Sequence, residues 1–590
     1  MFSFRNLLRG SVFFAFSAGA IIAQDAVSPG AGVPAATLKL NARTVVVDVV
    51  VTDKDGRAVP GLRKDDFQVT ENGKPQTIDY FEPHFAAASA APPAAPPLPP
   101  NTFTNVPATA PNEAVNVLLM DALNTQIADQ MYVRKEMFSY LASIPPGIRV
   151  GVFVLGEKLR IIQGFTQDSA ILRASIARLA ANPNSSALLS SPSESDAQAN
   201  LVNIIADQPQ GSGLQSAMAL QDFLGQEASF EYNQRILTTL DSLQQIARYL
   251  AGVPGRKNLI WFAGSIPICL PVGPAPCPYE EKVEETFHML ADARVAVYPI
   301  GATGLETNAL YDAGVPQLQV TNYQSLIASQ KGSLKNEFES RSNLKYMRDW
   351  FAEETGGKAI PDTNDLKGAL ADDIEDGSRY YTLAYTPKNR KEVGKERKIE
   401  IKTASGSYKL SYRRGYLEET PKQIRAAEAT PAKDPLRPLM DRGMPNFTEL
   451  RYRVKVEPAA IQPPAGAPRA GDNTALTAPC TRYSVNFSLA ADGLTLVPGP
   501  DGVRRQIIEV ALVVYSQEGK PLNWETRPVR LTSRPEPTQF GQTSGIPFQF
   551  HFDFDAPPGD VYLRTGIYAT SSNRAGTLEI PLSSITVASK

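Results

Sequence analysis

The stretch VNVLLMDALNTQIAD, residues 115–129, decides the fold that the sequence predicts. Its apolar run ends at Asp121, the chain then turns through Ala-Leu-Asn-Thr, and a helical pattern begins. A short apolar run of this kind is typical of a buried strand in a parallel sheet, and ligands bind such open sheets at the C-terminal ends of their strands. Asp121 is therefore the first candidate site residue.

The same alternation of short apolar runs and amphipathic helices extends over residues 114–416 and predicts a doubly wound α/β domain. On one expected helix Val133, Met137 and Leu141 share a face, and on another Ile236, Leu240 and Leu243 do so. Two insertions, 181–228 and 302–335, are expected to be surface loops. The expected strands are 115–120, 149–155, 159–162, 258–262, 295–300, 358–360 and 380–385, with 397–403 and 407–413 finishing the domain.

The rest of the 590 residues predicts an exported chain with β-rich flanks. Residues 1–23 have a basic start, an apolar run too short for a membrane span and small residues at the end, as in a cleaved signal peptide. The remaining expected parts are a small β domain (38–85), a Pro/Ala-rich linker (86–113), a second linker (417–446) and a C-terminal β-sandwich (447–590). No further run is long enough to span a bilayer, so the location is periplasmic, cell-envelope or extracellular.

Net charge, cysteine content and the lack of a nucleophile motif argue against several classes of function. Lys and Arg number 59 against 61 Asp and Glu, so no overall field attracts nucleic acid. The three cysteines are too few for a disulfide scaffold, although Cys269 and Cys277 bracket a Pro-rich loop and could close it as a disulfide. Three scattered histidines and no Gly-x-Ser-x-Gly elbow give no support to a Ser-His-Asp enzyme.

A set of ordered stretches resembles the von Willebrand factor A domain and, more closely, the VWFA-related domain family of acidobacterial exported proteins. The resemblance covers roughly residues 40 to 416 and implies a binding domain in which Mg²⁺ or Mn²⁺ sits after the first strand. The stretches that carry it are VVVDVVVTDKDGRAVPGLRKDDFQVTENGKPQTI, LLMDALNT, GRKNLIWFAGS, DARVAVYPIGATGL, EETGGKAI, and RYYTLAYTP followed by RRGY.

Carried over by position, the resemblance implies a degenerate metal-ion-dependent adhesion site at Asp121, Thr125 and Thr239, or Thr238 in place of Thr239. Leu123 stands where the family has a serine, and an alanine follows NLIWF where the family has an aspartate. The alternative from the residues alone is that Asp121 caps its turn by accepting backbone N–H bonds near Asn124 and Thr125.

The sequence therefore predicts an exported, non-enzymatic protein that uses its α/β domain to bind a protein or a cell-surface ligand. Mg²⁺ and Mn²⁺ are the candidate ions, and no other cofactor is expected. Two alternatives stay open: a structural scaffold of the cell envelope, and a hydrolase whose paired carboxylates leave no spacing signal.

Overall fold

The computed structural model describes most of the chain from residue 44 onward. Undescribed are 1–43, 86–97, 107–113, 143, 146, 182–211, 269–277, 303–341, 361–362, 364, 389–395, 405, 418–434, 465–468, 477–478, 492–493, 495, 499–500, 502, 534–546 and 587–590. The expected signal peptide and the cysteine pair Cys269 and Cys277 thus lie outside the described residues. No helix in the described part of the chain is long and apolar enough to cross a membrane.

The centre of the α/β domain is a five-stranded sheet in the order β10-β9-β6-β7-β8. The first four of these strands run parallel, and β8 pairs antiparallel with β7 through a short hairpin. A bridge from Ile300 to Ile360 adds one more parallel contact beside β10. The bounds are β6 Val115–Asp121, β7 Arg149–Leu155, β8 Leu159–Thr166, β9 Lys257–Ala263 and β10 Val295–Gly301.

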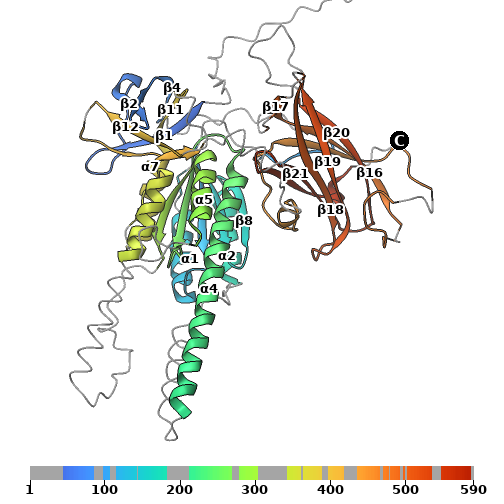
Figure 1. The fold of residues 1–590 in the computed structure, drawn as a ribbon, viewed down its shortest axis with the longest axis horizontal. Coiled ribbons are helices and arrows are strands. Elements are labelled where there is room, and N and C mark those ends of the chain that lie inside the picture. The colour runs from blue at the N-terminus through green and yellow to red at the C-terminus, as the bar shows by residue number, and fades with distance from the viewer. Residues whose placement is uncertain are drawn as a thin grey trace, which may run out of the picture. The chain divides into compact units, whose positions relative to one another are not determined.

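Helices cover both faces of this sheet, so its parallel strands are buried as their continuous apolar sequence predicts (Figure 1). On one face α1 (Ile127–Ala142), α2 (Ser169–Ala181) and α7 (Leu366–Ser378) pack against the sheet. On the other face α4 (Ser212–Leu250), α5 (Glu280–Asp292) and a helix over 342–355 do so. The prediction of a doubly wound α/β domain is confirmed at this level.

The end of the α/β domain differs from the prediction. The strand at 380–385 and the two that follow were expected to finish it, but they belong to the N-terminal β domain. One sheet of that domain has the order β13-β1-β11-β4 and the other β14-β12-β2-β3. The bounds are β1 Val45–Thr52, β2 Phe67–Glu71, β3 Lys74–Gln76, β4 Ile78–His84, β11 Tyr380–Tyr385, β12 Glu396–Thr403, β13 Lys409–Ser411 and β14 Gly415–Leu417, with a 3-10 turn at Lys64–Asp66.

The physical reason lies in the apolar faces of the N-terminal strands. The 40 residues from Val45 to His84 cannot by themselves cover Val47 and Val49 on β1 and Phe67 and Val69 on β2, which share one buried cluster with Ile399 of β12. In the register found here, Val47 pairs with Leu383 and Val69 with Ile401. The N-terminal β domain is therefore built from two parts of the chain that flank the α/β domain.

The C-terminal β-sandwich is present as predicted, but it takes one strand from the expected Pro/Ala-rich linker. Thr102–Thr104 forms β5, which pairs with β15 at the edge of the sheet β20-β16-β15-β5, where flanking prolines do no harm. The facing sheet is β17-β18-β21-β22, with β19 also paired to β18. The bounds are β15 Tyr452–Pro458, β16 Thr481–Leu489, β17 Val497–Pro498, β18 Arg504–Tyr515, β19 Pro521–Ser533, β20 Phe548–Ala556, β21 Tyr562–Ala569 and β22 Arg574–Pro581, with 3-10 turns at Arg437–Leu439 and Leu582–Ser584.

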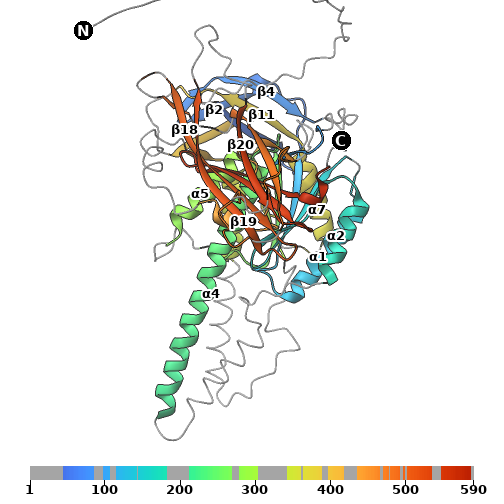
Figure 2. The same ribbon diagram turned by 90° about the vertical axis from the view of Figure 1, so that its right-hand side faces the viewer.

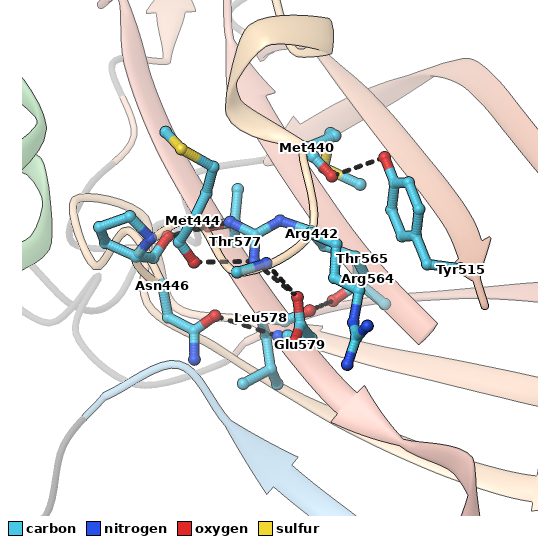
Figure 3. A network of polar contacts seen from close by, with 12 residues as sticks. Met440, Arg442, Met444, Asn446, Tyr515, Arg564, Thr565, Thr577, Leu578 and Glu579 are labelled. Atoms are coloured by element: carbon cyan, nitrogen blue, oxygen red, sulfur yellow. Dashed lines mark hydrogen bonds and ion pairs between the residues drawn. The ribbon is translucent and has the colours of Figure 1, made fainter. Parts of the chain in front are cut away.

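The end of the second expected linker is also part of the sandwich. Arg564 is fully buried and donates hydrogen bonds to the carbonyl oxygens of Leu439, Met444 and Pro445. Figure 3 shows Arg564 beside Met444 and Glu579. It also contacts Glu579, with Nη1 3.4 Å from a carboxylate oxygen. This guanidinium and the Tyr515 hydroxyl, which donates to the carbonyl oxygen of Met440, thus help to hold residues 436–447 on the sandwich, and the linker ends earlier than residue 446.

The first expected loop insertion, 181–228, is in part helical. Residues 212–228, predicted as loop, form the first half of α4, which continues without a break to Leu250. At 1.5 Å per residue this helix is roughly 60 Å long, about twice what the sheet needs. Figure 1 and Figure 2 both show α4 running far past the end of the sheet. The Ser- and Gln-rich composition misled the prediction because none of the described side chains before Ile236 is buried.

Candidate functional site

Asp121 ends β6 as a fully buried carboxylate that accepts three hydrogen bonds. Its Oδ1 accepts from the backbone N–H of Asn124 at 2.9 Å, which is the turn-capping bond that the sequence allows. Its Oδ2 accepts from the side-chain amide of Asn124 at 2.8 Å and from the indole N–H of Trp261 at 3.1 Å. The capping interpretation is confirmed for Asn124, and both carboxylate oxygens are occupied.

Asn124 links Asp121 to helix α4. Its Nδ2 also donates to Thr239 Oγ1 at 2.9 Å, and its Oδ1 accepts from Arg235 Nε at 3.1 Å. Arg235 and Thr239 are four residues apart on α4, so both face the end of β6. A terminal nitrogen of Arg235 donates to Ser265 Oγ at 2.9 Å, just after β9.

The predicted site residues are therefore only partly brought together. Asp121 and Thr239 both contact Asn124, whereas Thr125 faces the end of β9, where its Oγ1 accepts from the backbone N–H of Gly264 at 2.9 Å. Leu123 is buried in the core of the domain and offers no oxygen.

These residues do not fit a divalent ion in the arrangement described here. Mg²⁺ requires an octahedron of oxygen ligands, yet the amide nitrogen of Asn124 lies between the carboxylate of Asp121 and the hydroxyl of Thr239. Ala263 contributes no carboxylate at the end of β9. Among the described residues, no group of three or more His, Cys, Asp and Glu side chains is placed to hold a metal. Metal binding at Asp121, Thr125 and Thr239 stays a prediction that would require Asn124 to move away.

Burial dominates the electrostatics of the site. It raises the pKa of Asp121 to about 6 from 3.8, although the hydrogen bonds from Asn124 and Trp261 and the charge of Arg235 pull the pKa back down. Burial also lowers the pKa of Arg235, against the attraction of Asp121. The folded pKa of Asp121 lies above its unfolded value, so its contribution favours folding at low pH. That contribution, about 3 kcal/mol, is lost as the pH rises from about 4 through about 6.

The indole N–H of Trp261 should report this ionisation. We expect its proton NMR signal to titrate with a midpoint near pH 6, because the indole donates to the atom that gains or loses the charge. The measurement is a pH series of indole spectra from the full chain, in which three tryptophans give three signals. Asp121→Asn should abolish the titration of that signal, and a midpoint near 4 in the unsubstituted chain would contradict the assignment.

Sequence reasoning missed three members of this network: Arg235, Trp261 and Ser265. The tryptophan and the serine lie in the quoted stretch GRKNLIWFAGS, but only the position of the missing aspartate was considered there. Arg235 is 111 residues from Asn124 along the chain, and no local pattern marks it. Its position four residues before Thr239 is the one signal that could have found it, once α4 was known to be a helix.

The central domain is thus a doubly wound α/β domain with Asp121 at the end of a central strand, and with Thr239 and the end of β9 beside it. Its resemblance to the von Willebrand factor A domain stays a prediction. No family model and no curated protein matches the chain. The closer resemblance to the acidobacterial exported proteins stays a prediction.

Solved structures with partial likeness include three that differ in kind. An aerotolerance-related membrane protein from Bacteroides fragilis is 11% identical, with 44% of this chain and 98% of that chain covered and a TM-score of 0.20. The manganese-loaded TRAP protein of Plasmodium vivax is 10% identical, with 54% and 97% covered and a TM-score of 0.20. A von Willebrand factor type A protein from Catenulispora acidiphila is 11% identical, with 66% and 82% covered and a TM-score of 0.16. Likenesses at these values assign no function to this chain.

Proposed function

We propose that this chain is an exported, non-enzymatic binding protein whose partner is another protein. The partner contacts the edge of the central sheet that is formed by the C-terminal ends of its parallel strands, where Asp121 lies. It also contacts the part of α4 that extends beyond these strand ends. The observation that carries the proposal is the set of large apolar side chains exposed on this extension. We name residues 212–235 of α4 the overhang.

The overhang exposes large apolar side chains to solvent. Phe223 is 61% exposed, Phe230 62% and Met218 59%, and Tyr232 is exposed one turn before Arg235. This segment is roughly 35 Å long and none of its described side chains is fully buried, so the domain contributes little packing stabilisation to it. Exposed aromatic residues that lie close together are typical of protein-binding surfaces.

Helix α1 adds apolar surface at the same edge. It begins directly after the turn that holds Asn124, and its first turns expose Ile127 at 52% and Met131 at 65%. The turn, α1 and the overhang thus present apolar side chains around a polar centre. This is the general anatomy of a protein interface, although the two helices lie on opposite faces of the sheet.

A paired substitution on the overhang tests the proposal. We expect Phe223→Ser with Phe230→Ser to reduce capture of a discrete partner from an envelope extract at least tenfold, because aromatic anchors carry much of the energy of protein interfaces. The measurement is quantitative mass spectrometry of the captured proteins.

The matched control is Gln221→Ser with Gln226→Ser, two exposed positions on the same helix, which should leave capture unchanged. Equal capture by both double variants would show that the overhang is not the binding surface. Diffuse retention of many proteins, equal for all three chains, would favour the alternative of an envelope scaffold.

A further inference from the structure

Arg235 is the cation of the candidate site, and two of its nitrogens are already held. Nε donates to Asn124 and Nη2 to Ser265, so the side of the guanidinium fork that these two nitrogens form is bound within the protein. The two acceptors come from the turn after β6 and from the end of β9, two neighbouring strands of the sheet. The head of Arg235 is therefore fixed in orientation before any ligand arrives.

The other side of the fork is open. Nη1 has no hydrogen-bond partner among the described residues, and the side chain is only partly buried. Asp121 and Glu231 attract Arg235 through space, but neither makes a direct ion pair with it in the described part of the chain. Asp121 is instead reached through the amide of Asn124. A guanidinium that is fixed in orientation, partly exposed and not ion-paired within the protein is suited to bind a carboxylate from another molecule.

The same geometry makes a divalent ion unnecessary. The amide of Asn124 satisfies Asp121 and Thr239, which are two of the oxygen groups that a metal would otherwise bind. Arg235 supplies the positive charge on the far side of that amide. A guanidinium binds a carboxylate through two parallel N–H···O bonds, and it does so with a permanent charge at any physiological pH.

We propose that Arg235 is the recognition residue of this edge for a carboxylate of the partner, and that it acts without a divalent metal ion. The inference rests on the proposed function, since the carboxylate belongs to the partner protein. The exposed Phe230 and Tyr232, on the turns of α4 just before Arg235, provide the apolar surroundings that strengthen such a contact by excluding water.

Sodium acetate is the probe, with sodium chloride at the same ionic strength as its control. In the full chain with EDTA present, we expect acetate to shift the NMR signals of the Arg235 Nε–H and of the Trp261 indole N–H in a saturable way. The indole responds because Trp261, Asp121, Asn124 and Arg235 form one chain of hydrogen bonds. Arg235→Gln should weaken the response of the indole at least tenfold, and Arg235→Lys should weaken it less.

The indole signals of Trp350 and Trp524 show whether each variant is folded. If Arg235→Gln disturbs them, Ser265→Ala decides the matter: it releases one anchor of the guanidinium and should lower the apparent affinity for acetate while the fold is kept. An acetate response of the indole that is the same in all variants would overturn the inference.

Manganese provides the second decisive readout. A Mn²⁺ ion bound at Asp121 would broaden the indole signal of Trp261 beyond detection, since the indole nitrogen is 3.1 Å from the carboxylate. We expect no such broadening at equimolar Mn²⁺, and its occurrence, or an acetate response that EDTA removes, would overturn the inference. Neither readout requires the partner protein, so a failure here leaves the partner test with Phe223 and Phe230 intact, and the reverse also holds.

Discussion

Replacing Arg397 by methionine is expected to destabilise the N-terminal β domain by about 3–5 kcal/mol, because it leaves a buried carboxylate without its counter-ion. Arg397 and Glu71 form an ion pair at 2.8 Å, with 1% and 2% of their side chains exposed. Glu71 also accepts from the hydroxyls of Tyr385 at 3.0 Å and Tyr416 at 2.7 Å. These neutral donors cannot balance the charge that remains.

The measurement is thermal unfolding of the full chain, with hydrogen exchange followed on the peptides of β2, β11 and β12. Lys402→Met, an exposed position on the same strand as Arg397, is the matched control and should change stability by less than about 0.5 kcal/mol. Adding Glu71→Gln to Arg397→Met should recover part of the loss, since no lone charge is then buried. Equal losses for Arg397→Met and Lys402→Met would mean that the pair contributes nothing.

Arg564→Met is expected to have an effect of similar size, about 4 kcal/mol, on the C-terminal sandwich. The guanidinium is fully buried, and the three carbonyl oxygens that it satisfies, at Leu439, Met444 and Pro445, would each lose a donor. Each unsatisfied buried acceptor costs about 1–3 kcal/mol. Methionine fills a similar volume, so the loss reports hydrogen bonding more than packing.

Hydrogen exchange locates this second effect. Amides of residues 436–447 should lose protection first, because Arg564 holds that segment on the sandwich, whereas the amides of the α/β domain should keep theirs. Arg530→Met, at an exposed position on β19, is the control and should leave both regions unchanged. Protection of residues 436–447 that survives Arg564→Met would show that the apolar contacts of Leu436 and Met440 are sufficient.

Local sequence patterns account for the individual elements. The apolar run before Asp121, the helical faces of Val133 and Ile236, and the alternation in the C-terminal strands each report which side of an element is buried, and burial follows period 3.6 or 2. The Gly-Gly pair in EETGGKAI is explained in the same local way. A Cβ on Gly357 would lie 1.9 Å from the carbonyl oxygen of Val297, so the chain cannot pass β10 with a larger residue there.

The sequence by itself determined the α/β class, the place of Asp121 at a strand end, and the C-terminal sandwich. The tertiary structure alone decided that β11, β12 and β13 pair with the N-terminal strands and that β5 joins the sandwich. A strand's partner depends on which distant apolar face has to be covered. It likewise decided the chemistry of the site. Arg235 reaches Asn124 only because one continuous helix carries it there, and a guanidinium then stands beside the place where the sequence pointed to a metal ion.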